Sequence, residues 1–404
     1  MSEETLLRLL LLAIPISSGL IGWLTNWLAI QMTFYPIEYK GIRPFGWQGI
    51  IPSKARSMAA RSVDLITSKL LKIDERFQQI DAQQIAEIIH PHLTVLSNKL
   101  VDEIMEAQAR QVWKNTPEFV KRQVYQNATD NIPALVLLVM KDIQEQINTL
   151  LNIKHIAIQT LSRDRSLLNK VFQECGREEF KFLVKSGLYF GFVLGLPQMF
   201  ISYYYNPWWL LPLFGLLVGY ATNTIALRLI FTPREPISIL GLFTLQGLFL
   251  KRQQEVAEEY ATIVDQEIVT TEAMFAYVMR GPGTPHLEKI ITERVNHWID
   301  EVVGNSTSTV LVELLVGKKL SIVKNIAVYR LMEELPIIVS NVFDYTRETL
   351  DIENQLKEKM QALPPKDFES FLRPIFQEDE TTLILIGASL GLLAGTLQWY
   401  FLFS

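Results

Sequence analysis

Gly22-Trp-Leu-Thr25-Asn26-Trp-Leu-Ala29-Ile30 is a stretch that the chain uses again, as Gly219-Tyr-Ala-Thr222-Asn223-Thr-Ile-Ala226-Leu227. Both copies lie in long uncharged runs, and both lead to an aromatic-x-Pro ending, at Phe34-Tyr35-Pro36 and Phe231-Thr232-Pro233. Internal similarity at a fixed distance is the signature of a repeated structural unit. The sequence therefore predicts that one structural unit occurs twice in tandem.

The similarity continues along both halves of the chain. The matched pairs are Gln48-Gly49 with Gln246-Gly247, Pro91-His92-Leu93 with Pro285-His286-Leu287, and Phe172-Gln173-Glu174 with Phe376-Gln377-Glu378. Each half ends on a shared pattern, Gly187, Gly191, Gly195 and Gln198 in the first and Gly387, Gly391, Gly395 and Gln398 in the second. Since both halves would enter the membrane in the same sense, we expect a parallel repeat and not an inverted one.

Three uncharged runs are long enough to cross a bilayer, whose core takes roughly 20 apolar helical residues. They cover 9–37, 186–227 and 381–404. The middle run is divided at 203–209, where three Tyr, Asn-Pro and two Trp predict a turn at the membrane surface. A secretory signal peptide is the alternative for the first run, but the acidic start Met1-Ser2-Glu3-Glu4 lacks the basic region of such a peptide. We expect four spans.

The predicted fold class is an all-α integral membrane protein built from two tandem parallel repeats. Each repeat is a transmembrane helix, a cytoplasmic helical segment and a second transmembrane helix. Lys and Arg near the span ends cluster on the side of the two large polar segments, which places these in the cytoplasm. The expected segments are 1–36 (first span with the Thr-Asn motif), 37–182 (cytoplasmic), 183–231 (a hairpin of spans two and three), 232–380 (cytoplasmic) and 381–404 (last span).

Apolar residues at helical spacing predict amphipathic helices over 59–71, 85–109 and 134–151 in the first polar segment. Proline and glycine predict where helices end. The expected breaks are His90-Pro91, Thr116-Pro117, Ile132-Pro133, 281–285 and Leu363-Pro364-Pro365.

The paired Thr25-Asn26 and Thr222-Asn223 are candidate site residues, because polar side chains inside a membrane are costly and often functional. The functional interpretation is a polar patch that contacts a headgroup or an ion. The structural interpretation is hydrogen bonding between helices, worth about 0.6 kcal/mol on average. We favour the structural interpretation.

The candidate packing residues are glycines spaced four apart on one helical face, at Gly187, Gly191 and Gly195 and again at Gly387, Gly391 and Gly395. Small residues at this spacing let helix backbones approach closely, which favours packing over a permeation path. Two arrangements remain open. The second span packs on the fourth, or each packs on the Thr-Asn span of its own half.

Motifs for chemistry are sparse. His90-x-His92 has the spacing of a metal site, but no carboxylate stands at ligand spacing nearby, so packing is the favoured interpretation. Cys175 lies among Glu174, Glu178 and Glu179, which would raise a thiol pKa and discourage nucleophilic use. The 43 acids and 38 Lys and Arg are too balanced for a nucleic-acid binder. We expect no catalytic residue, no metal, no cofactor and no enzymatic activity.

The combined motifs resemble those of the YheB-like membrane proteins, a family catalogued as a domain of unknown function. The resemblance rests on Gly-x-x-Thr-Asn-x-x-Ala-Ile from Gly22, the following Phe34-x-Pro36, Gly-Ile-Ile-Pro-x-Lys-x-Arg from Gly49, and Phe172-Gln-Glu followed by the glycine series to Gln198. It covers essentially the whole chain, although Leu250 stands where the first half has Pro52. The length and the Trp-rich spans are similar to the cyanobacterial members, which implies a thylakoid membrane, with the plasma membrane as the alternative. The resemblance implies no activity, substrate or catalytic residue.

Two kinds of function fit these observations. The first is a non-enzymatic structural or scaffolding protein whose cytoplasmic helices bind a partner protein or the membrane surface. The alternative is handling or transport of a lipid or small molecule, with amphipathic helices forming an apolar groove. A channel ranks third, because no ionisable residue lies deep inside a predicted span. The expected partners are the lipid bilayer and a protein partner or second copy of the chain, and no nucleic acid.

Overall fold

The computed structural model describes residues 3–42, 46–205, 207–239, 243–305, 320–377 and 380–403. The chain forms two compact units. Unit 1 comprises Met1–Leu70, Ala157–Ile268 and Glu353–Ser404, and unit 2 comprises Leu71–Ile156 and Val269–Ile352. Each unit therefore takes segments from both halves of the sequence.

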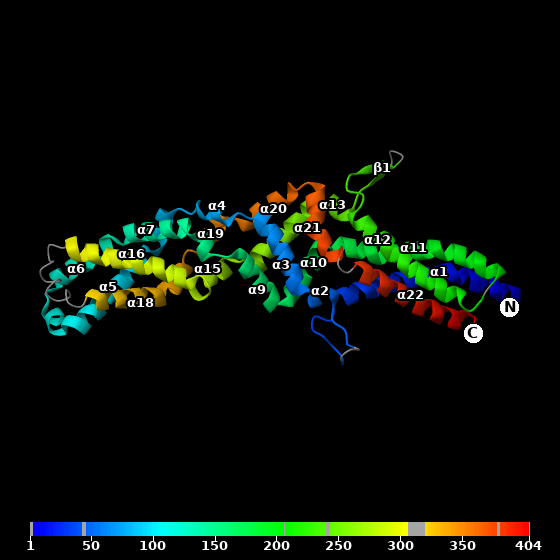
Figure 1. The fold of residues 1–404 in the computed structure, drawn as a ribbon, viewed down its shortest axis with the longest axis horizontal. Helices are drawn as coiled ribbons and strands as arrows, with labels where there is room; N and C mark the ends of the chain where they lie inside the picture. The colour runs from blue at the N-terminus through cyan, green and yellow to red at the C-terminus, as the bar shows by residue number, and fades with distance from the viewer. Residues whose placement is uncertain are drawn as a thin grey trace. The chain divides into compact units, whose positions relative to one another are not determined.

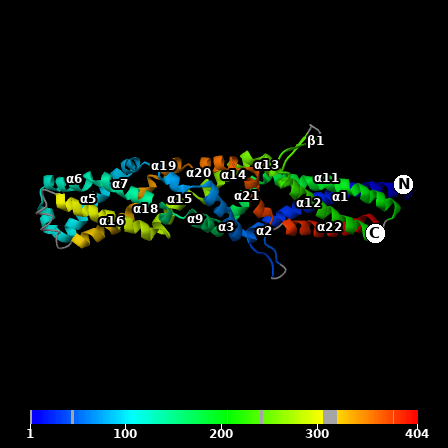
Figure 2. The same ribbon diagram turned by 45° about the horizontal axis from the view of Figure 1, so that its top comes forward.

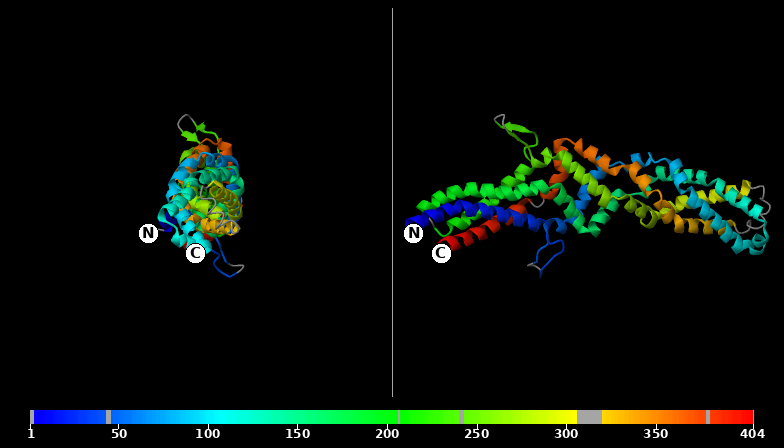
Figure 3. Two further views of the ribbon diagram at one scale, coloured as in Figure 1. Left: turned by 90° about the vertical axis from the view of Figure 1, so that its left-hand side faces the viewer. Right: turned by 180° about the vertical axis from the view of Figure 1, so that it is seen from behind.

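Among the residues just given, unit 1 has four helices that are long and apolar enough to cross a membrane: α1 (Glu3–Phe34), α11 (Arg177–Tyr204), α12 (Leu210–Phe231) and α22 (Glu380–Phe403). A helix satisfies all its own backbone hydrogen bonds, as a spanning segment must. Helix α1 packs along α11, and α12 packs along α22 (Figure 1). Figures 2 and 3 show the four helices alongside one another from other directions. The prediction of a mostly helical chain with four candidate spans is confirmed.

The rest of unit 1 consists of short elements that follow the spans. They are α2 (Ile50–Ser53), α3 (Ala55–Leu65), the π-helix η1 (Ile66–Leu70), α9 (Ile153–Arg163, which begins in unit 2), α10 (Arg165–Cys175), β1 (Ile237–Ile239), β2 (Phe243–Leu245), α13 (Leu248–Lys251), α14 (Gln253–Ile263), the π-helix η2 (Val264–Ile268), α20 (Ile352–Gln361, whose first residue belongs to unit 2) and α21 (Pro365–Gln377). The two strands pair antiparallel, with Ser238 opposite Thr244. This small hairpin is an exception to the all-α prediction.

Unit 2 is a bundle of helices. Its elements are α4 (Ile73–Phe77), α5 (Ala82–Asn115), α6 (Glu118–Asp130), α7 (Ile132–Glu145), α8 (Ile147–Leu150), α15 (Thr271–Arg280), α16 (Thr284–Asn305), α18 (Leu320–Ser340) and α19 (Phe343–Leu350). Helix α5 packs against α7 and α18, and α16 packs against α7 and α18. One apolar core results, which includes Leu150 of α8 and Leu287, Ile291 and Val295 of α16. Figure 2 shows α5, α16 and α18 running together.

The break predicted at His90-Pro91 is wrong, because α5 continues through Pro91 to Asn115. Proline removes one helical N–H and clashes with the carbonyl four residues earlier. Pro91 lies on the exposed side of α5, where water can hydrate the carbonyl that loses its partner. The backbone of α5 departs from helical angles instead at Ala109 (φ −148°, ψ 39°). The other predicted breaks fall at helix boundaries: Thr116-Pro117 precedes α6, and Ile132, Thr284 and Pro365 are the first residues of α7, α16 and α21.

Candidate functional site

The six stripe glycines lie at the contacts within the two membrane helix pairs. On α11, a Cβ added to Gly187 would overlap the backbone of Gly22, and one added to Gly191 would stand 2.5 Å from the Ser18 carbonyl oxygen. On α22, the added Cβ atoms of Gly387, Gly391 and Gly395 would meet backbone or side-chain atoms of α12. Of the two arrangements that the sequence leaves open, the structure has each stripe against the Thr-Asn helix of its own half.

The paired asparagines hydrogen-bond across the same contacts. Asn26 Nδ2 donates to the Leu183 carbonyl oxygen at 2.8 Å, and Asn223 Nδ2 donates to the Leu383 carbonyl oxygen at 2.9 Å. The Thr25 and Thr222 hydroxyls donate to carbonyl oxygens of their own helices, at Gly22 and Gly219. Each asparagine is thus directed at the neighbouring helix of its own pair, and this geometry is that of interhelical hydrogen bonding.

Two glutamines near the other end of the spans also contact α1, and sequence reasoning did not identify their partners. Gln198 is buried and accepts a hydrogen bond from the Ser18 hydroxyl at 2.9 Å. Gln398 Nε2 donates to the Ser17 hydroxyl oxygen at 2.6 Å, which joins α22 to α1. The available signal in the sequence was the pair of adjacent serines, Ser17 and Ser18, in the otherwise apolar first part of this span, residues 9–24.

A buried ion pair lies where α11 begins, and sequence reasoning missed it as well. Both oxygens of Glu179, a side chain only 1% exposed, accept hydrogen bonds from Arg252 Nη1, at 2.9 and 3.1 Å. Arg252 also donates to Glu255 at 2.7 Å. The pair ties the start of α11 to the turn before α14. A carboxylate this deeply buried is stable only with such a partner.

Cys175 is buried beside this ion pair. Burial raises the pKa of its thiol far above the usual value, and the charges of Glu259 and Glu179 raise it further. A thiol in this state is a poor nucleophile. Across the described residues, no group of three or more His, Cys, Asp or Glu side chains is placed to hold a metal ion.

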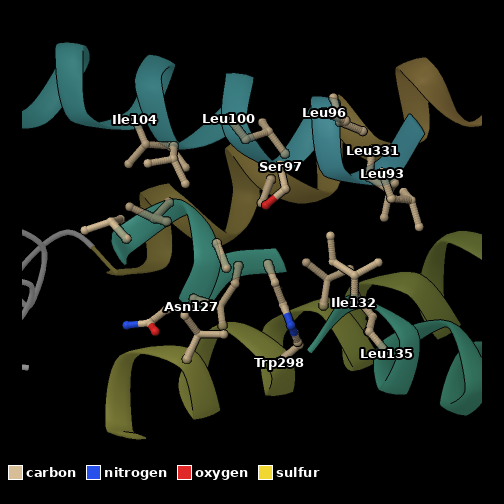
Figure 4. Close-up of a pocket in the computed structure, with 18 of the residues that line it drawn as sticks. Leu93, Leu96, Ser97, Leu100, Ile104, Asn127, Ile132, Leu135, Trp298 and Leu331 are labelled. Atoms are coloured by element: carbon tan, nitrogen blue, oxygen red, sulfur yellow. The ribbon is translucent and has the colours of Figure 1, made fainter. Parts of the chain in front are cut away.

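Two apolar cavities lie among the described helices of unit 2. The first has a volume of about 180 Å³ and lies between α5, α6, α16 and α18 (Figure 4). The second has a volume of about 160 Å³ and is lined by α4, α5, α7, α15, α16, α18 and α19, among others. The two share four lining side chains, Leu93, Leu135, Val295 and Leu331, so they adjoin.

The walls of the first cavity are almost entirely aliphatic. The described residues that line it include no charged side chain, and its polar groups come from Ser97, Asn127 and Trp298. Figure 4 shows Ser97 on α5 and Trp298 on α16 reaching into one space from facing helices. The indole Nε1 of Trp298 is buried and has no hydrogen-bond partner. Such a site can hold an apolar molecule and offer it one hydrogen-bond donor.

The fold and these sites define a multi-pass membrane protein that carries a helical unit with an apolar interior. The chain is similar to UPF0754 membrane proteins of Anoxybacillus flavithermus and Geobacillus kaustophilus, at 30% and 33% identity over 88 residues. The match covers 21% of this chain and about a quarter of those relatives (24% and 23%). A third such protein, of Geobacillus thermodenitrificans, is 42% identical over 62 residues, which is 15% of this chain and 16% of the relative. No family model and no solved structure matches the chain.

Proposed function

We propose that this protein is a non-enzymatic membrane protein that handles a lipid or another apolar small molecule, with unit 2 as the binding unit. The observation that carries the proposal is the pair of adjoining cavities. Protein interiors are normally packed with few voids larger than a water molecule. An engineered cavity of about 150 Å³ lined by aliphatic and aromatic side chains binds benzene, and each cavity in unit 2 is larger than that.

An empty cavity also has an energetic cost. Side chains that face a void lose the contacts that a filled interior would give them. A bound apolar molecule would recover much of that free energy. Scaffolding ranks first on the sequence alone, and the cavities favour the ligand-handling alternative instead.

The test is photolabelling of the full chain in nanodiscs with a diazirine-bearing dodecane, followed by mass spectrometry. We expect labelled side chains on α5, α16 and α18, in addition to the lipid-facing membrane helices. Ala327 is buried in the wall of the first cavity, so Ala327→Phe should fill that cavity and abolish label at its wall residues Leu100 and Ile299, while label in the second cavity persists. Ser321→Phe, at an exposed position of the same helix, is the matched control and should leave labelling unchanged. Absence of label in unit 2 of the unaltered chain would reject the proposal.

We also propose that the chain is a tandem duplication whose two repeats fold together. The duplication is supported by two π-helices, η1 and η2, which occupy corresponding positions after the first and third spans. The backbone N–H of Gly49 donates to Pro36 at 2.9 Å, and that of Gly247 donates to Pro233 at 2.8 Å. Since each unit takes segments from both halves, residues 1–205 expressed alone should not fold. Co-expression with 206–404 should restore a complex. A stable, folded first half would contradict intertwined repeats.

A second candidate function is scaffolding, with the polar segments on the cytoplasmic side. It is favoured by large apolar side chains on the outside of unit 2: Phe119 on α6 is 72% exposed, and Tyr329 and Ile337 on α18 are 66% and 62% exposed. Tyr329 and Ile337 are eight residues apart, about two helical turns, so they lie on one face of α18, and an exposed apolar face of this kind marks an interaction surface. Phe119→Ser and Ile337→Ser should abolish function in a deletion strain while cavity labelling persists, if scaffolding is the function. Unchanged complementation would reject it.

A further inference from the structure

The first cavity of unit 2 has a polar feature that a purely apolar ligand would leave unused. Trp298 Nε1 is an N–H donor, buried without any acceptor. In folded proteins nearly every buried donor has a hydrogen-bond partner, so an unpaired one calls for an explanation. Its indole faces the same space as the Ser97 hydroxyl from the opposite wall (Figure 4). A hydroxyl can rotate to donate a second hydrogen bond to one oxygen atom.

The charge of a ligand is restricted by the rest of the wall. Among the described residues that line either cavity, none is charged. Moving an ionised carboxylate or ammonium into such surroundings is strongly unfavourable without a counter-charge. An uncharged carbonyl oxygen has no such penalty and is a strong acceptor for an indole N–H. The site therefore favours a neutral ligand over a free fatty acid in its ionised form.

The shape of a ligand follows from the second cavity. Because the two cavities share Leu93, Leu135, Val295 and Leu331 as wall residues, a molecule anchored at Trp298 can extend past these side chains into the next cavity. The second cavity is lined almost completely by aliphatic, Phe and Met side chains. An alkyl chain matches this surface, since its transfer from water is favourable for each buried CH₂ group.

We propose that unit 2 binds a neutral lipid with one alkyl chain, whose uncharged carbonyl oxygen accepts a hydrogen bond from Trp298 Nε1. Ser97 lies on the facing wall and supplies the second donor to the same oxygen. The alkyl chain lies between α5, α16 and α18 and reaches the second cavity. This assignment rests on the proposed ligand-handling function, and it adds the ligand's charge state, its acceptor group and the residue that recognises it.

The experiment compares three photolabels of equal chain length in nanodiscs containing the full chain. They are diazirine-bearing dodecane, methyl dodecanoate and dodecanoate at pH 8. Label on α5, α16 and α18 is divided by label on the membrane helices of the same sample, which cancels differences in partition into the bilayer. We expect the methyl ester to exceed dodecane about fivefold, the effect of one net hydrogen bond, and to exceed dodecanoate by a larger factor, because the ionised carboxylate adds its desolvation penalty.

Substitutions then identify the donor. Trp298→Phe should lower ester labelling about fivefold and leave dodecane labelling unchanged. Trp113→Phe is the matched control, because the Trp113 indole already donates to Asp102 at 3.0 Å, and it should alter neither. Ser97→Ala should give a smaller, ester-specific loss, and it serves as the test if Trp298→Phe does not fold. Equal labelling by ester and alkane, or stronger labelling by dodecanoate, overturns the assignment while ligand handling stands. No label in unit 2 from any probe rejects both.

Discussion

The helix pairs α1–α11 and α12–α22 make the same two kinds of contact and then differ in a third. In each pair, glycines bring two backbones together, and an asparagine donates to a carbonyl oxygen of the neighbouring helix. Four residues before the motif glycine, however, α1 has Ser18 and α12 has Gly215. Gln198 therefore finds a hydroxyl within its own pair, whereas Gln398 bonds to Ser17 of α1, in the other pair.

This difference indicates which helix pair depends on the other for its buried hydrogen bonds. The first pair satisfies its buried glutamine internally, so its polar contacts do not require α12 or α22. The second pair has no equivalent hydroxyl at Gly215, and its glutamine is satisfied only when α22 lies against α1. Since an unpaired polar group in lipid is costly, Gln398 favours association of the two pairs into one four-helix unit.

The largest expected effect comes from filling the glycine contacts. Gly191→Leu and Gly391→Leu place an isobutyl group where an added Cβ alone would already overlap backbone carbonyls. Each should destabilise the protein by at least about 3 kcal/mol, at the upper end of overpacking costs. Thermal unfolding of the purified protein in detergent measures the loss.

The controls for the glycine variants are residues on the lipid-facing sides of the same helices. Leu188 on α11 is 37% exposed and Leu393 on α22 is 62% exposed. Leu188→Phe and Leu393→Phe should change the free energy of unfolding by less than about 0.5 kcal/mol. If Gly191→Leu and Leu188→Phe lower stability equally, the stripe does not form the contact. If only one pair is sensitive, the pairs are not equivalent.

The next effect should be specific to the first pair. Glu179→Gln leaves Arg252 without its buried counter-charge, and breaking a buried ion pair from one side costs about 3 kcal/mol or more. The corresponding position at the start of α22, counted from Gly187 and Gly387, is residue 379, which lies outside the described residues. Arg252→Leu with Glu179→Leu should recover much of the loss, because an apolar pair removes both desolvated charges. If the double variant is as unstable as Glu179→Gln, the ion pair with Arg252 does not account for the contribution of Glu179 to the free energy of unfolding.

The sequence predicted the spans well and the tertiary contacts poorly, for physical reasons that these residues illustrate. The hairpin of spans two and three, predicted at 183–231 with a turn at 203–209, ends in α12 at Leu210–Phe231, because a long uncharged run is a local property. The His90-Pro91 break failed because the tolerance of a helix for proline depends on which face it occupies. Glu179 and Arg252 are 73 residues apart, and nothing local pairs them. The cavities depend on the shapes of side chains from several helices, which hydrophobic periodicity does not record.

A smaller effect is expected from the two asparagines. Asn26→Leu and Asn223→Leu each remove one interhelical hydrogen bond, for a loss of about 1 kcal/mol or less. Asn26 should be the milder variant, since its side-chain oxygen is already buried without a partner and leucine removes that penalty. Melting temperature and complementation of a deletion strain are measured on both single variants and the double variant. Function lost while stability is kept would reject the structural interpretation and support a polar site.

The smallest effect is expected from the hydrogen bond that links the two helix pairs, between Gln398 of α22 and Ser17 of α1. In a double-mutant cycle, Ser17→Ala and Gln398→Leu should show a coupling of about 0.6 kcal/mol, the average for a hydrogen bond between membrane helices. Ser18→Ala and Gln198→Leu should couple to a similar extent. The crossed combination, Ser18→Ala with Gln398→Leu, should be additive, because no hydrogen bond joins these two residues. A serine cannot replace Gly215 to test the difference between the pairs, because a Cβ there would overlap the Gly391 carbonyl oxygen and would push α12 and α22 apart. If the Ser17–Gln398 cycle shows no coupling, α22 is held against α1 by backbone packing, and the hydrogen bond of Gln398 does not link the two pairs.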